Sequence, residues 1–346
     1  MSSLIPPTIL SFLLCVAAIY CTAKNVLPSE EDYYFLFKTF VKKYNRSYIN
    51  DTAEFNHRFI IFKQNVKKVS NMEVFSDGAQ FGITKFSDLT EKEFTELYLK
   101  GLKGKHPLLK SSQQPPNSTT PMQNIRKLKI PLAMDWRKSK AVTKVKNQGS
   151  CGACWAFSCV ETMESMCAIM KNISAPELSV QEVIDCTGES LGCRGGDTCS
   201  TLQWLQKNNQ TVVYESAYPL KDIDESCRPI KKDAPGAQVI ESTCDNFVGK
   251  EDKMLLHLAQ NGPLVAAVDA STWSNYQKGI IRYHCEATNN HAVQIVGYNI
   301  SGEVPYYIVR NSWGNDFGIA GYLHIAVGSN LCGLAQEIST LQIKIV

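Results

Sequence analysis

Two short segments of the chain carry side chains that could together perform nucleophilic catalysis. Cys154 follows a Gly-Ser-Cys-Gly turn and opens an apolar stretch without Gly or Pro, which predicts a helix that begins at the cysteine. Free N–H groups at a helix N-terminus and the positive end of the helix dipole favour a thiolate over a thiol. His291 opens an apolar stretch that predicts a strand. An imidazole beside the sulfur could hold its proton and later protonate a leaving amine.

Other polar residues would complete this arrangement. Asn311 begins the sequence Asn-Ser-Trp-Gly, and its side-chain oxygen could accept the second ring proton of His291 and fix the imidazole. Trp313 over that contact would exclude water from it. The side-chain amide of Gln148 and the backbone N–H of Cys154 could both face a developing oxyanion. The expected catalytic residues are therefore Cys154, His291, Asn311 and Gln148.

Other interpretations of the same residues stay open at this point. Cys151 and Cys154 have the spacing of a redox pair or of half a zinc site. The sequence has no second Cys-x-x-Cys pair and no histidine pair at zinc-site spacing, so we expect no metal and no cofactor. His291 taken alone is more often a satisfied core residue than a catalytic one.

The elements that must position these residues are predicted to be helices first and a sheet second. Cys154 to Met170 predicts a largely buried helix, and Leu202 to Lys207 predicts a further helical piece. After Pro263 the chain changes to short β-branched and aromatic stretches, which predict strands at 264–268, 292–298, 306–310 and 322–327. The expected fold class is α+β, without an internal repeat.

Length and composition limit the class of protein. The chain has 346 residues, of which 44% are apolar and 20% charged, and its formal net charge is +3. This is an ordinary globular balance. No stretch of Lys and Arg is longer than two, which argues against nucleic acid as a partner.

The N-terminus and the cysteines indicate the secretory pathway. Residues 9–20 are apolar almost throughout and small residues follow, so residues 1–23 are predicted to be a signal peptide. A membrane anchor is the alternative, but the stretch is short for a span. The 13 cysteines are ordinary where disulfides persist. We expect a lysosomal or secreted protein without a membrane span. Its N-glycosylation sequons begin at Asn45, Asn50, Asn117, Asn172, Asn209 and Asn299.

Residues 24–129 differ in character from the rest of the chain. Residues 100–129 are rich in Pro, Gly, Ser and Gln, which predicts an extended or mobile linker. From Ile130 onward cysteines, aromatics and glycines are closely spaced, which places the main domain at 130–346. Residues 30–98 are charged and predicted to be helical, with one apolar stripe made of Phe55, Phe59, Phe62, Val66 and Val69.

These motifs resemble those of the papain family of cysteine proteases, over the chain from about residue 30 to its end. The resemblance of the main domain rests on Gln148 to Phe157, Asn290-His291-Ala292 and Asn311 to Gly314. Ile130-Pro131 with Asp135-Trp136-Arg137 is similar to a mature N-terminus, and the segments 273–285, 290–293 and 328–330 indicate one subfamily. Two motifs are similar to the family's inhibitory propeptide, with Thr84 where Asn is usual: Glu54, Arg58, Phe62, Asn65 and Val69, then Gly82, Thr84, Phe86 and Asp88.

The resemblance implies a papain-like fold of two lobes. An N-terminal helical lobe with a buried central helix would face a β-barrel-like C-terminal lobe. It also implies a cysteine endopeptidase that works through a thioester acyl-enzyme and is made as a zymogen. Residues 24–129 would then form an inhibitory propeptide whose linker passes through the cleft in reverse. No insertion is evident between Cys193 and Lys207, which favours an endopeptidase over an enzyme that removes C-terminal dipeptides.

Disulfides are also implied by the resemblance. Cys151 would pair with Cys193, Cys186 with Cys227, and Cys285 with Cys332. Four further cysteines have no counterpart in this pattern: Cys159, Cys167, Cys199 and Cys244. Buried free thiols are the simplest state for Cys159 and Cys167, and a Cys167–Cys199 bridge is the alternative.

A substrate cleft follows from the same resemblance. Gly195 and Gly196 would let a substrate backbone approach and pair by main-chain hydrogen bonds. Glu337 would lie at the floor of the pocket for the side chain two residues before the cleaved bond, and would favour Arg or Lys there beside aliphatic residues. A Glu337 that points to solvent is the alternative. The other substrate-binding residues implied are Asp197, Thr198, Ala267, Asn290, Ala292 and Trp313.

The resemblance also predicts the partners of the protein and how its activity is controlled. The resemblance implies a monomer that acts on protein and peptide substrates, is inhibited by its own propeptide and is open to cystatin-type inhibitors. Acid would release the propeptide, because protonation of carboxylates weakens ion pairs. Two other functions stay open: a catalytically silent binding protein, and a peptide ligase in which an amine replaces water in the second step. Phe317 departs from the family, which usually has a second Trp there on the leaving-group side.

Overall fold

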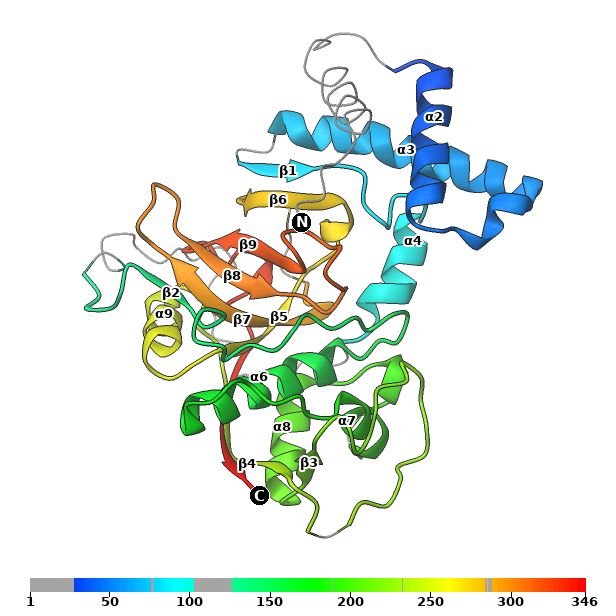
Figure 1. Cartoon of the computed structure of the whole chain (residues 1–346). Coiled ribbons are helices and arrows are strands. Elements are labelled where there is room, and N and C mark those ends of the chain that lie inside the picture. The colour runs from blue at the N-terminus through cyan, green and yellow to red at the C-terminus, as the bar shows by residue number, and fades with distance from the viewer. Residues whose placement is uncertain are drawn as a thin grey trace, which may run out of the picture. The chain divides into compact units, whose positions relative to one another are not determined.

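The computed structural model describes residues 28–75, 78–102, 125, 127–188, 190–231, 233–283, 285 and 288–346 (Figure 1). The predicted signal peptide, most of the predicted linker and Asn117 lie outside the described residues. By its contacts the chain divides into two compact units, one that ends at Lys63 and one that begins at Gln64. The boundary falls inside a long helix, α3 (Thr52–Phe75).

The first unit contains α2 (Glu30–Lys43), a short 3₁₀ helix (Ser47–Asn50) and the first half of α3. Ser29 caps α2, because its side chain accepts the N–H of Asp32 while the Asp32 carboxylate accepts the N–H of Ser29 at 2.9 Å. Phe37 of α2 is fully buried and its ring packs on Phe55 and Phe62, with centroids 4.9 and 5.3 Å away. The first half of the predicted apolar stripe therefore faces α2.

A group of helices lies at one end of the second unit (Figure 1). Its centre is α6 (Cys154–Lys171), which is buried along most of its length and ends at Asn172, whose left-handed φ of 53° suits an Asn. Two shorter helices pack on α6, together with a short strand: α7 (Val180–Cys186), α8 (Thr198–Lys207) and β3 (Thr211–Val213). The helix expected at 154–170 is therefore confirmed. The helix expected at 202–207 begins four residues earlier, because Asp197 accepts the N–H of Ser200 at 2.6 Å and caps it.

The strands of the second unit form a sheet in the order β1-β6-β9-β8-β7-β5-β10-β4-β3, with β2 paired to β7. Neighbouring strands are antiparallel except β6 and β9, which are parallel. The strand bounds are β1 Ala79–Phe81, β2 Ala133–Asp135, β4 Gly236–Asp245, β5 Leu264–Val268, β6 Tyr276–Ile281, β7 His291–Asn299, β8 Tyr306–Arg310, β9 Tyr322–Ala326 and β10 Ile338–Ile345. Two more helical elements are α4 (Glu91–Phe94), continued by a wider π turn over Thr95–Leu99, and α9 (Glu251–Gln260).

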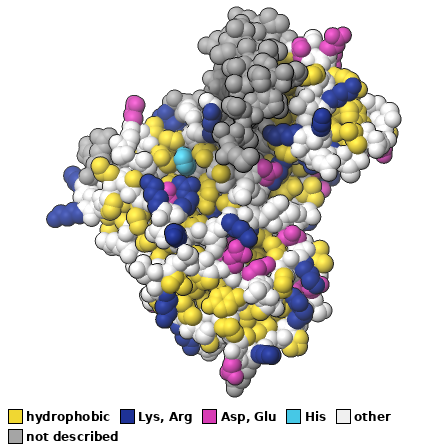
Figure 2. All heavy atoms as spheres, in the orientation of Figure 1, with side chains coloured by type: hydrophobic (Ala, Val, Ile, Leu, Met, Phe, Trp, Pro, Cys, Tyr) yellow, Lys and Arg dark blue, Asp and Glu magenta, His cyan; other side chains and the backbone are white. Residues whose placement is uncertain are grey.

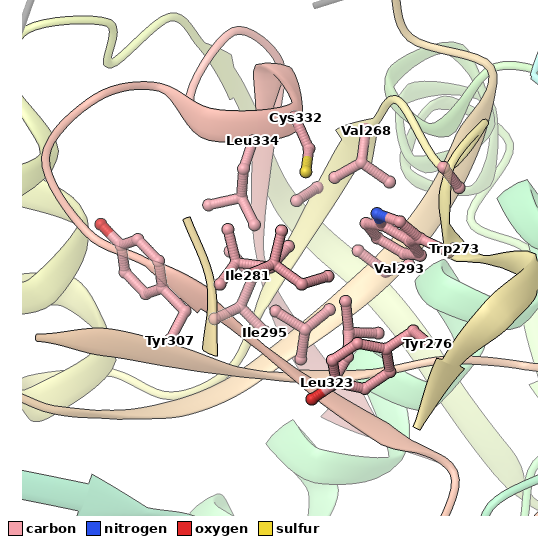
Figure 3. Packing of buried hydrophobic residues seen from close by; sticks show 14 of the residues in the cluster. Val268, Trp273, Tyr276, Ile281, Val293, Ile295, Tyr307, Leu323, Cys332 and Leu334 are labelled. Carbon is pink, nitrogen blue, oxygen red and sulfur yellow. The ribbon is translucent and has the colours of Figure 1, made fainter. Parts of the chain in front are cut away.

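The core of the sheet lobe is one cluster of buried apolar side chains (Figure 3). They come from strands far apart in the sequence and from the 3₁₀ turns beside them: Val268, Trp273, Tyr276, Ile281, Val293, Ile295, Tyr307, Leu323, Cys332 and Leu334. Helix α6 packs against β7, so the helical lobe and the sheet lobe meet along that helix. The α+β architecture of two lobes expected from the sequence is confirmed.

Among the residues that the structure describes, four disulfides cross-link the second unit. Three are the pairs that the resemblance implies: Cys151–Cys193, Cys186–Cys227 and Cys285–Cys332. The fourth, Cys199–Cys244, joins α8 to β4 with 5.9 Å between the Cα atoms, so the alternative Cys167–Cys199 bridge is wrong. Cys159 and Cys167 are buried free thiols on α6.

The surface carries both signs of charge. On the described part of the face in Figure 2, Lys and Arg side chains are interspersed with Asp and Glu and do not form a patch of one sign. Among the described residues, no helix has the length and apolar character needed to cross a bilayer.

Candidate active site

The sulfur of Cys154 lies at the start of the central helix. Cys154 is the first residue of α6 and is completely buried, and Ala153 before it supplies no side-chain cap to the helix N-terminus. Burial raises the pKa of the Cys154 thiol to about 12, although backbone hydrogen bonds from Ala292 and Trp155 oppose the rise. In this form of the chain the sulfur therefore keeps its proton.

His291 and Asn311 are brought together from two neighbouring strands. His291 opens β7 and Asn311 directly follows β8, and the imidazole Nε2 lies 2.8 Å from the amide Oδ1 of Asn311. An amide oxygen only accepts hydrogen bonds, so Nε2 carries the proton and Nδ1 is the free acceptor of the neutral ring. Nδ1 is buried and has no hydrogen-bond partner. It is the atom available to take a proton from the thiol.

Burial also sets the charge of the imidazole. It lowers the pKa of His291 to about 4, although the bond to Asn311 opposes the shift. Trp313 lies over the ring with 4.9 Å between centroids, and Trp273 meets it edge-on at 6.3 Å. Because the pKa of Cys154 is raised and that of His291 is lowered, both groups are neutral over the pH range between these values.

Gln148 is anchored to the loop that carries Asn311. Its side chain is fully buried, donates from Nε2 to the carbonyl of Cys151 at 3.0 Å and accepts at Oε1 from the Ser312 hydroxyl at 2.6 Å. Its backbone N–H donates to the Ser312 carbonyl at 2.8 Å. These three bonds fix the amide between the turn before α6 and the end of β8.

A segment from the N-terminal side of the chain covers the cysteine. Gly101 has so little room that a Cβ added to it would lie 2.6 Å from the Cys154 Sγ and 2.9 Å from the carbonyl oxygen of Gly152. The carbonyl of Gly101 accepts the N–H of Gly196 at 2.9 Å, and Leu102 forms a parallel bridge with Gly196. The backbone at 101–102 therefore occupies the hydrogen-bonding edge beside Gly196.

The same N-terminal segment covers Trp313. Three aromatic rings surround the buried indole edge-on, with centroid distances of 5.4 Å to Phe86, 5.4 Å to Phe94 and 6.0 Å to Tyr98. Phe317, the departure noted in the sequence, is buried and packs edge-on against Trp313 at 4.9 Å. Trp313 is thus enclosed from both sides.

Several expected substrate-binding residues lie around Gly196. A Cβ on Gly196 would lie 2.5 Å from the Trp155 ring, which explains the glycine there. Ala267 and Ala292 are paired across β5 and β7, and the Ala267 N–H donates to the carbonyl of Glu337 at 3.0 Å. Gly195 directly precedes Gly196 and follows the 3₁₀ turn at Cys193, and Thr198 is buried in the first turn of α8. Asn290 bonds to Asp269, Ala270 and Ser271.

Two carboxyl groups meet among these residues. Asp197 and Glu337 are 8% and 5% exposed, so Glu337 does not point to solvent. Their Oδ2 and Oε1 atoms are buried and accept no hydrogen bond from another residue, and the two carboxyl groups can share a proton only with each other. Burial, and then the charge of Asp197, raises the pKa of Glu337 to about 8. A pair of buried carboxyl groups attracts either a proton or another cation.

The sequons differ in accessibility. Asn45, Asn50, Asn172 and Asn209 are exposed. Asn299 is half-buried at the end of β7, and its Oδ1 accepts from the backbone and hydroxyl of Ser301.

Other groups at the site were not found from the sequence. Lys85 forms an ion pair with Asp316 at 2.7 Å and contacts the Trp313 carbonyl. Arg310, directly before Asn311, is completely buried. A charged residue at the end of an apolar strand was the only available signal for Arg310, and its partners are distant in the sequence.

Comparison with known proteins agrees with this geometry. Residues 130–342 match the papain family of cysteine proteases, and residues 37–94 match the cathepsin propeptide inhibitor domain (I29). The recombinant stem bromelain precursor is 31% identical with a TM-score of 0.75, and the match covers 90% of this chain and 98% of that structure. Procathepsin L2 from the Tenebrio molitor larval midgut is 28% identical with a TM-score of 0.77, over 90% of this chain and 99% of that structure.

The chain therefore belongs to the papain family: it is the precursor of a cysteine peptidase, a hydrolase, and it carries its own propeptide inhibitor domain. Within the family it is similar to human cathepsin O, with 41% identity over 264 residues, which cover 76% of this chain and 79% of the human protein. This is the subfamily indicated by the segments 273–285, 290–293 and 328–330.

Proposed function

We propose that this protein is a cysteine endopeptidase in which Cys154 is the nucleophile and His291 the acid–base group. The observation that carries the proposal is the free, buried Nδ1 of His291, whose other nitrogen is held by Asn311 at 2.8 Å. Removal of the covering segment exposes both groups to water. Exposure lowers the pKa of the thiol and raises that of the imidazole, so the proton moves from sulfur to ring.

The reaction then follows in two steps. The thiolate attacks the carbonyl carbon, the C–N bond breaks, and the imidazolium gives its proton to the leaving amine. Water next attacks the thioester, His291 takes its proton, and the thiolate of Cys154 leaves. The Gln148 amide and the Cys154 N–H stabilise the oxyanion formed in each step.

An active-site label tests this proposal. The acid-treated precursor is incubated with an epoxide probe for cysteine proteases, beside a Cys154→Ser control, and intact mass is measured. We expect one adduct on a fragment that begins near Ile130, and none in the control. A matured chain that takes up no probe and cleaves no peptide would favour the silent binding protein. Products joined to an added amine would favour the ligase.

We also infer that the precursor is silent in transit and matures in acid. The inference is supported by Gly101 against the Cys154 sulfur and by the Lys85–Asp316 ion pair. Protonation of carboxylates in acid removes such pairs and loosens the segment. The domain limits 1–23, 24–129 and 130–346 belong to the same proposal. The same proposal includes a lysosomal or secreted destination and glycans at the exposed sequons. It also includes inhibition by cystatin-type proteins and a monomeric state.

The second residue before the cleaved bond is proposed to be basic or aliphatic. The two buried carboxyl groups of Asp197 and Glu337 support this, since a cation between them could replace the proton that they share and satisfy both oxygens. Below about 8 Glu337 is mainly protonated, and it ionises as pH rises through that value. The preference for arginine over leucine at this position should therefore increase as pH rises through about 8.

Matched peptides that differ only at that position test the preference. Glu337→Gln keeps the shape and removes the charge, so above about pH 8 we expect kcat/KM for the arginine peptide to fall by roughly tenfold to a hundredfold, the value of a charge-assisted hydrogen bond. The leucine peptide should change by less than about threefold, since its contacts are apolar. An arginine preference that Glu337→Gln leaves intact at every pH would contradict the role of Glu337.

A further inference from the structure

A charged side chain lies directly behind the proposed catalytic residues. Arg310 ends β8, directly before Asn311, and its side chain has no exposure to solvent. Burial of a guanidinium is costly unless partners surround it. The partners of Arg310 therefore show what the residue does.

Its guanidinium contacts three separate parts of the second unit, two by hydrogen bonds and one by an ion pair. Nη1 donates to Gln294 Oε1 of β7 at 3.3 Å. Nη2 donates to the Thr143 hydroxyl at 3.0 Å and to the Lys144 carbonyl, both in the segment before Gln148. The same nitrogen lies 3.3 Å from Glu161 Oε1 of α6.

The partners are also bonded to one another. Gln294 faces Arg310 across the β7–β8 pairing, and its Nε2 donates to the Glu161 carbonyl at 3.0 Å and to the Ser165 hydroxyl at 2.9 Å. Thr143 donates at 2.6 Å to Glu164, the next buried carboxylate of α6, which also pairs with Lys146 at 2.5 Å. The network is thus continuous from α6 to both strands.

Each element in the network also carries a proposed catalytic residue. Glu161 lies on the same side of α6 as Cys154, about two helical turns and roughly 10 Å further along. Gln294 is on β7, which His291 opens, and Arg310 adjoins Asn311. A shift of α6 against the strands would therefore change the network and the distance from sulfur to imidazole together.

Stability alone does not explain such a network. Buried ion pairs contribute little net stability compared with apolar side chains of similar volume. The planar guanidinium instead supplies donors in fixed directions, which specify how its partners lie. Catalysis depends on that precision, because a displacement of about 1 Å can cost on the order of a hundredfold in rate.

We propose that Arg310 is a positioning residue, which forms an ion pair with Glu161 of α6 and hydrogen bonds to Gln294 of β7 and the segment at 143–144. It thereby keeps Cys154 in register with His291 and Asn311. This inference rests on the proposed function of those three residues. It assigns Arg310 no contact with substrate.

The test must separate positioning from folding. Arg310→Met keeps much of the side-chain volume but leaves Glu161 without its cation. Burial raises the pKa of Glu161 to about 7 against the charges of Arg310 and Lys146, with Glu164 adding to the rise. Without Arg310 the pKa of Glu161 should rise further, so the carboxyl would keep its proton in acid and at neutral pH and could no longer form an ion pair. The double variant Arg310→Met/Glu161→Gln removes this titrating group and should fold over the whole pH range.

Glu182→Gln is the matched control. Glu182 is another buried carboxyl with a pKa raised by burial to about 7, but its bonds to Gln210 and the Val213 N–H stay in the helical lobe. All precursors are matured in acid, and melting temperature, kcat, KM and the pH profile of Cys154 alkylation by iodoacetamide are measured. Peptide hydrolysis by the wild type, and its loss in Cys154→Ser, first establish the proposed function.

We expect the double variant to melt close to wild type but to lose roughly tenfold to a hundredfold in kcat, with KM within about threefold. Alkylation of Cys154 should become slower, and the acid limb of its pH profile should shift, because the thiolate–imidazolium pair forms less readily. Glu182→Gln should lower only the melting temperature. A folded double variant with wild-type kcat and alkylation profile would overturn the inference while leaving the proposed function intact. A loss matched by Glu182→Gln would also overturn it.

Discussion

Replacing Gly101 with valine is expected to expose Cys154 in the uncleaved precursor. Even one Cβ at this position would lie 2.6 Å from the sulfur and 2.9 Å from the Gly152 carbonyl, so the segment must move away. Overpacking of this kind costs about 1–3 kcal/mol, which weakens docking of the segment roughly tenfold to a hundredfold. Wild type is expected to mature only in acid, whereas Gly101→Val should also mature at neutral pH.

Alkylation of the intact precursor measures this directly. In wild type the covered thiol has a raised pKa and should react slowly with iodoacetamide at neutral pH. In Gly101→Val we expect the rate at Cys154 to rise by a factor on the order of ten to a hundred, following the weakened docking. Peptide mapping separates Cys154 from the buried thiols Cys159 and Cys167.

Gly82→Ala is the control for this experiment. Its added Cβ would lie 2.3 Å from the end of the Gln277 side chain, which is flexible enough to move aside. We therefore expect little change in alkylation or maturation. If Gly101→Val behaves like Gly82→Ala, the segment at 101–102 does not control access to the sulfur.

The sequence predicted those parts of the fold that depend on local pattern. The expected strands at 264–268 and 306–310 coincide with β5 and β8, because each is a short β-branched or aromatic stretch bounded by turns. The start of α8 was missed, because it depends on one side-chain bond from Asp197. Met170, in the last turn of α6, is 48% exposed, although the helix was expected to be largely buried.

Contacts between residues that are far apart in the sequence limited what could be predicted about the site. Residue chemistry and motif resemblance were enough to propose Cys154, His291 and Asn311 as one group. The Cys199–Cys244 bridge was not predicted, since spacing does not determine connectivity. The network of Arg310 was missed for a related reason: Glu161 and Gln294 only become its neighbours when α6 packs on the sheet.

Gln148→Ala is expected to reduce peptide hydrolysis by roughly a hundredfold to a thousandfold in kcat, the typical cost of one oxyanion donor. The amide of Gln148 is held in place by Ser312 and Cys151 and needs no reorganisation when negative charge develops. KM should change little, because the ground-state carbonyl gains less from this donor than the oxyanion does.

Two comparisons make the role of Gln148 specific. Alkylation of Cys154 by iodoacetamide creates no oxyanion, so Gln148→Ala should leave the alkylation rate within about threefold while hydrolysis collapses. Ser312→Ala removes only the hydroxyl that bonds Gln148 Oε1, and the loss of one neutral hydrogen bond should cost about fivefold to tenfold. Equal losses in alkylation and hydrolysis would show instead that Gln148 orients the Cys154–His291 pair. A kcat close to wild type would remove the amide from the mechanism and leave the backbone N–H of Cys154 as the donor.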